Sequence, residues 1–87
     1  MARILVVDDV ALNRDLVVTI LQHAGHSSRE ASDGAQALEQ VRAWHPDLVV
    51  CDILMPTMDG YAFVRHLREE PEIRDTRVVF YLSLIHI

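Results

Sequence analysis

The stretch Ile4-Leu5-Val6-Val7-Asp8-Asp9 decides the fold of this 87-residue chain. Its four aliphatic residues form a continuous apolar run, which is typical of a strand buried on both faces of a parallel sheet. The run stops at two aspartates, so two acidic side chains follow the carboxyl end of the strand. A second run of this kind, Leu48 to Cys51, also stops at an aspartate, Asp52. The pattern predicts that acidic groups gather at one edge of one sheet.

Short strand patterns alternate with longer helical patterns along the rest of the chain. Apolar residues recur at helical spacing over residues 12–24, 37–44 and 61–69, and strand patterns cover 27–31 and 78–82. The first of these helices carries one apolar stripe, in which Leu12, Leu16, Ile20 and Ala24 recur every four residues with Val17 and Leu21 beside them. Alternation of strands and helices predicts an α/β fold with a mainly parallel sheet and helices on both faces. In open sheets of this class, ligands bind beyond the carboxyl ends of the strands.

The amino-acid composition limits the classes of protein to which the chain can belong. The chain has eight arginines and no lysine against thirteen acidic residues, a net charge of −5, and 51% hydrophobic residues. This composition indicates a globular domain, and the acidic balance argues against a general nucleic-acid binder. No apolar run approaches the ~18 residues that cross a bilayer. The single cysteine, Cys51, excludes an internal disulfide framework and fits a reducing compartment, so we expect a cytoplasmic protein.

The acidic residues at the two strand ends predict a metal site. If the two buried strands are parallel neighbours, they lie ~4.8 Å apart and Asp8, Asp9 and Asp52 meet. Three uncompensated carboxylates repel one another, and a divalent cation removes the conflict. A set of oxygen ligands without clustered His or Cys favours Mg²⁺ or Mn²⁺ over zinc. Solvated loop residues or helix caps are the alternative interpretation, which three aspartates at two buried strands disfavour. A carboxylate in such a site can attack phosphorus and form an aspartyl phosphate.

At this point the sequence resembles a known family. Residues 4–9, 31–38 and 48–60 are similar, in order and spacing, to the receiver domain of two-component response regulators. The resemblance implies a flavodoxin-like fold, a three-layer parallel sheet with strand order 2-1-3-4-5. It also implies a phosphorelay in which the donor is a phosphohistidine on a sensor histidine kinase or a histidine phosphotransfer domain.

The resemblance further assigns roles to individual residues. Asp52 matches the phosphoacceptor and also contacts the metal. Asp9 matches a direct Mg²⁺ ligand, and Asp8 matches the acid that holds the ion through water. Leu54, two residues beyond the phosphoacceptor, would offer its backbone carbonyl to the ion, and Gly60 would permit a tight turn.

The chain departs from the family pattern towards its end. The family places a Ser or Thr where Leu82 stands, and Ser83 is one residue late, so we assign no switch hydroxyl. The family's catalytic lysine has no counterpart because the chain contains no lysine. We therefore expect residues 1–80 to be a partial receiver domain that lacks the last helix, strand and helix and is defective in output. Residues 81–87 are expected to be an atypical tail, similar to translated non-coding sequence; the alternative is a genuine variant whose last strand simply extends.

A receiver shortened in this way would leave apolar surface uncovered. Its fourth strand would form a sheet edge along residues 78–81, and its first helix would lose a packing neighbour. Apolar edges with little charge invite strand addition. We therefore expect marginal stability or self-association through the fourth strand.

Other functions remain open from the residues alone. A Mg²⁺-dependent phosphohydrolase with an aspartate nucleophile typically has Asp-x-Asp after the first strand, whereas this chain has Asp8-Asp9-Val10. A non-signalling stub that binds a kinase is the other alternative. A nucleotide-binding domain is disfavoured, because neither a G-x-G-x-x-G nor a Walker A pattern is present. Our leading prediction is a phosphoacceptor domain and not an enzyme.

Overall fold

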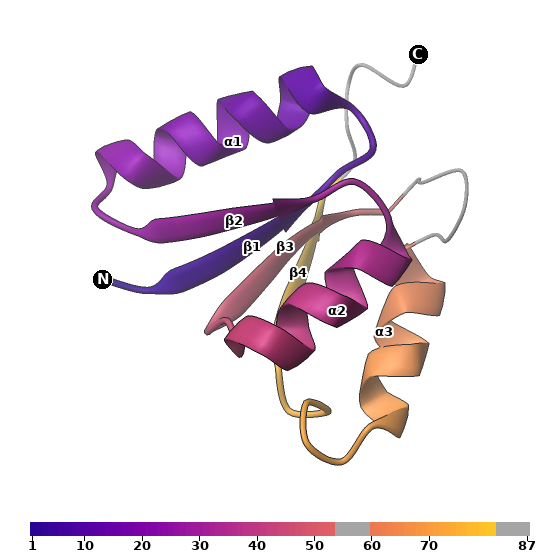
Figure 1. Ribbon diagram of the computed structural model, residues 1–87. Coiled ribbons are helices and arrows are strands. Elements are labelled where there is room, and N and C mark those ends of the chain that lie inside the picture. Colours follow the sequence, from indigo (N-terminus) through magenta and orange to yellow (C-terminus); the bar gives the residue numbers. More distant parts are fainter. Residues whose placement is uncertain (54–59, 82–87) are drawn as a thin grey trace.

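A computed structural model describes residues 1–53 and 60–81 of the chain. Four strands and three helices alternate along these residues (Figure 1). The strands are β1 (Arg3–Val7), β2 (Ser27–Ala31), β3 (Leu48–Asp52) and β4 (Arg77–Tyr81). The helices are α1 (Ala11–His23), α2 (Gly34–Trp44) and α3 (Gly60–Glu69).

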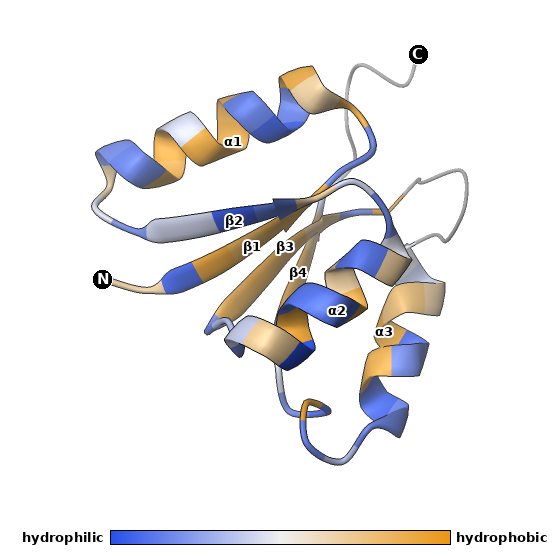
Figure 2. Ribbon diagram, viewed as in Figure 1, coloured by the Kyte–Doolittle hydropathy of each residue, from blue (hydrophilic) through white to orange (hydrophobic). Residues whose placement is uncertain are grey.

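The four strands form one parallel sheet in the order β2-β1-β3-β4. Helix α1 covers one face of the sheet, and α2 and α3 cover the other (Figure 1). The predicted α/β, flavodoxin-like architecture is therefore confirmed. The weakly patterned strand β2 lies at an edge, where fewer side chains need to be covered, and the aliphatic strands β1 and β3 lie inside. Figure 2 shows the same contrast, with β1 and β3 strongly hydrophobic and β2 mostly polar.

The hydrophobic core lies between the sheet and helices α2 and α3. Alternate residues of β1 and β3 point into it, as a side-chain period of two requires. Its buried members are Leu5, Val7, Ala31, Ala37, Leu38, Val41, Val49, Cys51, Phe63, Leu67 and Ile73. Helices α2 and α3 therefore supply the side chains that cover this face of the sheet.

Helix α2 has clear signals at both ends. The side chain of Asp33 accepts a hydrogen bond from the backbone N–H of Gln36 at 2.8 Å, which satisfies one donor of the first turn. At the other end His45 adopts a left-handed conformation with φ of 49°, directly before Pro46. Next to this end, the ring of Trp44 packs under two guanidinium groups, those of Arg3 at 5.9 Å and Arg29 at 4.9 Å.

The apolar stripe of α1 faces the described sheet only in part. Leu12, Leu16 and Ile20 are 66%, 61% and 59% exposed, while Val17 and Leu21 are half-buried. The helix packs over β1 and β2, so the half-buried residues face the sheet and the exposed ones point away from that contact. The periodicity predicted the helix correctly, and the sheet covers only the part of the predicted stripe formed by Val17 and Leu21.

The structure also tests the predicted length of the last strand and the prediction that no segment crosses a membrane. The last strand, expected over 78–82, spans Arg77–Tyr81, and Leu82 with the rest of the predicted tail lies outside the described residues. Among the described helices, none has the length and hydrophobicity needed to cross a membrane.

Candidate functional site

The carboxyl ends of β1 and β3 bring three aspartates together. Asp8 and Asp9 directly follow β1, and Asp52 is the last residue of β3. The parallel register pairs Val7 with Cys51, so the aspartates leave the sheet at the same level. One carboxylate oxygen from each lies within 4.8 Å of the others. Asp8 and Asp52 have no exposed surface, and Asp9 is half-buried.

Asp8 is held from several directions. Its Oδ1 accepts a hydrogen bond from the backbone N–H of Val10 at 2.9 Å, and its Oδ2 accepts one from the hydroxyl of Tyr81. Its backbone N–H donates to the carbonyl of Ala31 at 3.1 Å, and its carbonyl accepts from Nη1 of Arg14 at 2.7 Å. These hydrogen bonds fix the Asp8 side chain in place and give its completely buried carboxylate hydrogen-bond donors.

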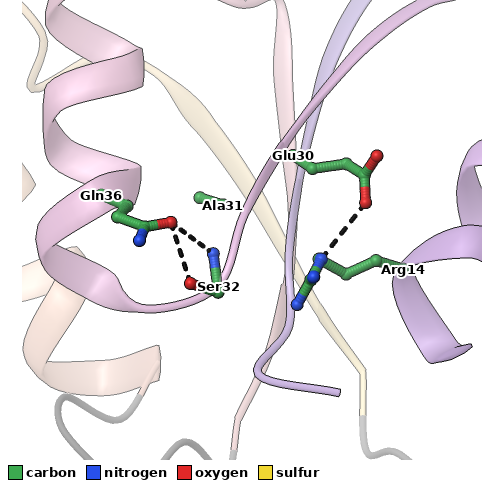
Figure 3. A pocket seen from close by; sticks show the side chains of 5 residues that line it. All are labelled: Arg14, Glu30, Ala31, Ser32 and Gln36. Carbon is green, nitrogen blue, oxygen red and sulfur yellow. Dashed lines mark hydrogen bonds and ion pairs between the residues drawn. The ribbon is translucent and has the colours of Figure 1, made fainter. Parts of the chain in front are cut away.

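Arg14 links the ends of two strands. Besides the Asp8 carbonyl on β1, its guanidinium binds the Glu30 carboxylate on β2, with Nε and Oε1 3.2 Å apart (Figure 3). A pocket of about 280 Å³ opens beside this ion pair, and Gln36 and Ser32 complete its lining. There the backbone N–H and hydroxyl of Ser32 both donate to Oε1 of Gln36 at 2.9 Å. The pocket thus adjoins the acidic residues through Arg14.

Gly60 lets α3 begin directly against the end of β3. A Cβ atom at this position would lie 2.6 Å from Cε1 of Phe80 and 3.0 Å from the backbone oxygen of Asp52. The Gly60 N–H also donates to the carbonyl of Ile53 at 2.9 Å. The close approach, and not only the predicted turn, explains why a residue without a side chain is needed here.

Burial changes the acidity of two groups beside the aspartates. Burial, followed by the nearby charges of Asp52 and Asp8, raises the pKa of the Cys51 thiol to about 12. Burial is also the largest cause that raises the pKa of Tyr81, and its hydrogen bond to Asp8 adds to the rise. Both groups therefore remain protonated near neutral pH, and Tyr81 remains a hydrogen-bond donor.

The donor set suits a hard divalent cation. All three side chains offer carboxylate oxygens, which Mg²⁺ and Mn²⁺ prefer. Two of the three come from a fully buried position, where uncompensated charge is costly. The residues present therefore fit the ion that the sequence predicts.

A comparison with protein families assigns the chain. The family model described as the response regulator receiver domain matches residues 4–83. The chain belongs to this family. The resemblance noted on the sequence is therefore confirmed, and the acidic edge of the sheet is that of a receiver domain.

The chain is also similar to parts of longer regulatory and sensor proteins. The chain is 41% identical over 71 residues to the probable transcriptional regulator ycf27 of Porphyridium aerugineum, covering 82% of the chain and 30% of that protein. It is 45% identical over 67 residues to the sensor protein EvgS of Escherichia coli K12, covering 77% of the chain and 6% of that protein. The chain thus spans less than a third of either relative.

A solved structure agrees with the fold. The N-terminal domain of a response regulator receiver protein from Methanoculleus marisnigri JR1 superposes with a TM-score of 0.89 at 38% identity. The match covers 92% of this chain and 65% of that one. The described sheet and helices therefore correspond to about two-thirds of the solved domain.

The predicted site residues divide into two groups. The structure brings Asp8, Asp9 and Asp52 together, whereas Leu54, Leu82 and Ser83 lie outside the described residues. Sequence reasoning missed two side chains that touch Asp8, those of Arg14 and Tyr81. Tyr81 lies 73 residues from Asp8, and although Arg14 lies only six residues away, its contact is with the Asp8 backbone carbonyl, which no sequence motif marks.

Proposed function

We propose that this receiver domain is the phosphoacceptor of a two-component phosphorelay, and that Asp52 accepts the phosphoryl group. The observation that carries the proposal is the placement of Asp52, a fully buried carboxylate at the end of β3 that shares one site with Asp8 and Asp9. The donor is a phosphohistidine on a sensor histidine kinase or a histidine phosphotransfer domain, as is usual for the family.

The reaction is a phosphoryl transfer between side chains. A carboxylate oxygen of Asp52 attacks the phosphorus, a P–O bond forms, and the P–N bond to the donor imidazole breaks. The bonding electron pair leaves with the imidazole nitrogen, so the products are a neutral histidine after protonation and an aspartyl phosphate. Such transfers require mainly positioning and charge stabilisation.

The remaining aspartates serve the divalent ion in this proposal. Asp9 and Asp52 would hold Mg²⁺ or Mn²⁺ directly, Asp8 would hold it through water, and the carbonyl of Leu54 would complete the set. When bound, the ion supplies positive charge against the phosphoryl oxygens. The backbone N–H of Val10 keeps Oδ1 of Asp8 in a fixed direction throughout.

Receiver domains are signalling modules, and we propose that this chain acts as one and not as an enzyme. In this proposal residues 1–80 form the receiver part, residues 81–87 an atypical tail, and the chain transmits no output by itself. We place it in the cytoplasm, which the single reduced and buried Cys51 supports.

Phosphorylation in solution tests the proposal. We expect incubation with Mg²⁺ and a small acyl-phosphate donor to add one acid-labile phosphate, which peptide mapping by mass spectrometry places on Asp52. Asp52→Asn should abolish the modification, whereas the matched control Asp75→Asn, at an exposed aspartate, should retain it. Phosphate on a different residue, or steady turnover of the donor by Asp52→Asn, would contradict the assignment.

A further inference from the structure

Tyr81 reaches across the acidic edge of the sheet. It is the last residue of β4 and the register partner of Asp52 on β3. Its hydroxyl nevertheless donates to Oδ2 of Asp8, which follows β1 on the far side of β3. Because neighbouring strands lie ~4.8 Å apart, the phenol side chain must cross the end of β3 to make this contact. Tyr81 therefore links the outer strand β4 to an acid that follows β1.

The bridge changes what Asp8 can offer to a cation. One of its oxygens accepts from the Val10 N–H and the other from the Tyr81 hydroxyl, so each oxygen already has a donor. A hydrogen bond donated to a buried carboxylate stabilises its negative charge, as a cation would. The phenol and an ion, or the ion's bound water, are thus alternative partners of the same oxygen.

We propose that Tyr81 is a tethered competitor of the divalent ion: its hydroxyl occupies Asp8 and its ring crosses Asp52, so the ion binds only as Tyr81 withdraws. This inference rests on the proposed function and adds a residue that sets the strength of ion binding. Tyr81 is a positioning residue here, since it acts through Asp8.

Ion binding measured directly gives the first test. Electron paramagnetic resonance of Mn²⁺ counts the ions left in solution and needs no phosphorylation. We expect Tyr81→Phe to bind Mn²⁺ about tenfold more tightly than the parent chain. A change of this size corresponds to the free energy of one hydrogen bond to a charged group. The matched control Tyr61→Phe alters a tyrosine that is 64% exposed and should leave the affinity unchanged.

The outcomes separate this inference from the proposed function. If the parent chain binds Mn²⁺ and Tyr81→Phe binds it equally well or more weakly, the role of Tyr81 is overturned. The receiver assignment then remains intact. No Mn²⁺ binding by either chain overturns both. Binding by Tyr81→Phe alone supports both, because it shows a competent acidic site that Tyr81 had blocked.

A measurement on the unaltered chain tests the inference even if the Tyr81→Phe variant does not fold. In a chain with isotopically labelled tyrosine rings, Mg²⁺ should shift the ring resonances of Tyr81 and leave those of Tyr61 in place. A Tyr81 resonance that does not respond to saturating Mg²⁺ would show that the phenol does not withdraw, and would refute the inference.

Discussion

At the scale of single residues, Gly60 is the position where the structure leaves least room. We expect Gly60→Ala to lower the free energy of unfolding by about 1–3 kcal/mol, because the new methyl group meets the Phe80 ring and the Asp52 carbonyl oxygen. Urea denaturation followed by circular dichroism measures this change. The clash also pushes on Asp52, so ion binding should weaken as well.

Two comparisons make the Gly60 prediction specific. Phe80→Leu should recover part of the stability in the Gly60→Ala background, because it removes the ring edge that lies 2.6 Å from the position of the new Cβ atom. Gly25→Ala should also destabilise the chain, but through its φ of 85° and not through contacts, since nothing lies within 4 Å of its Cβ position. Rescue of Gly25→Ala by Phe80→Leu would contradict the steric explanation.

The acidic residues show what the sequence can predict at this scale. Asp8, Asp9 and Asp52 follow apolar runs, so their meeting could be predicted from strand ends alone. The contacts of Tyr81 and Arg14 could not, because a long side chain reaches partners on strands that only the folded register brings near. Pattern analysis locates the ends of strands, whereas the reach of a side chain depends on the completed sheet.

At the scale of secondary-structure elements, α3 depends on two buried side chains. Phe63 and Leu67 have no exposed surface and form the helix's contact with the core. We expect Phe63→Ala to cost about 3–5 kcal/mol. A chain of this length has a total stability of roughly 4–13 kcal/mol, so the variant should lose a large share of it and show a much lower urea midpoint.

The control for that prediction lies on the same helix. Arg65 is exposed, so Arg65→Ala should leave the urea midpoint nearly unchanged. Similar losses of stability in both variants would contradict the role assigned to the contact with the core, because both changes raise helical propensity.

Helix α1 shows the limit of sequence analysis for an element. Its periodic apolar residues predicted a helix and its span, and both agree with the structure. Their spacing alone does not show which part of the stripe is covered. The exposure of Leu12, Leu16 and Ile20 agrees instead with the expectation, drawn from the family resemblance, that this helix lacks a packing neighbour. A periodic stripe shows that a face is apolar, but the strand or helix that covers the face is determined by the rest of the fold.

At the scale of the whole molecule, exposed apolar surface predicts association. The stripe of α1 and Val79, which is 53% exposed on the edge strand β4, offer two separate contact surfaces. We expect the 87-residue chain to self-associate, with a weight-average mass that rises with concentration in sedimentation experiments. A sharp thermal transition of a monomer at every concentration would contradict this prediction.

Charge substitutions distinguish the two surfaces. Leu16→Glu should restore the monomer if α1 makes the contact, and Val79→Lys should do so if strands pair at the β4 edge. Gln22→Glu adds the same charge as Leu16→Glu at an exposed polar position of α1 and should leave association unchanged. Loss of association in the Gln22→Glu chain would indicate a general effect of net charge.

The position of Trp44 has a spectroscopic consequence. The only tryptophan contacts Arg3 at the amino end of β1, whereas the aspartates follow the carboxyl ends of β1 and β3, about 15 Å further along a five-residue strand. Tryptophan emission will therefore follow the unfolding of the chain but respond little to ions. Tyr81, in contact with Asp8, reports on the opposite edge. The two ends of one sheet thus carry separate optical probes, one for folding and one for the chemistry of the site.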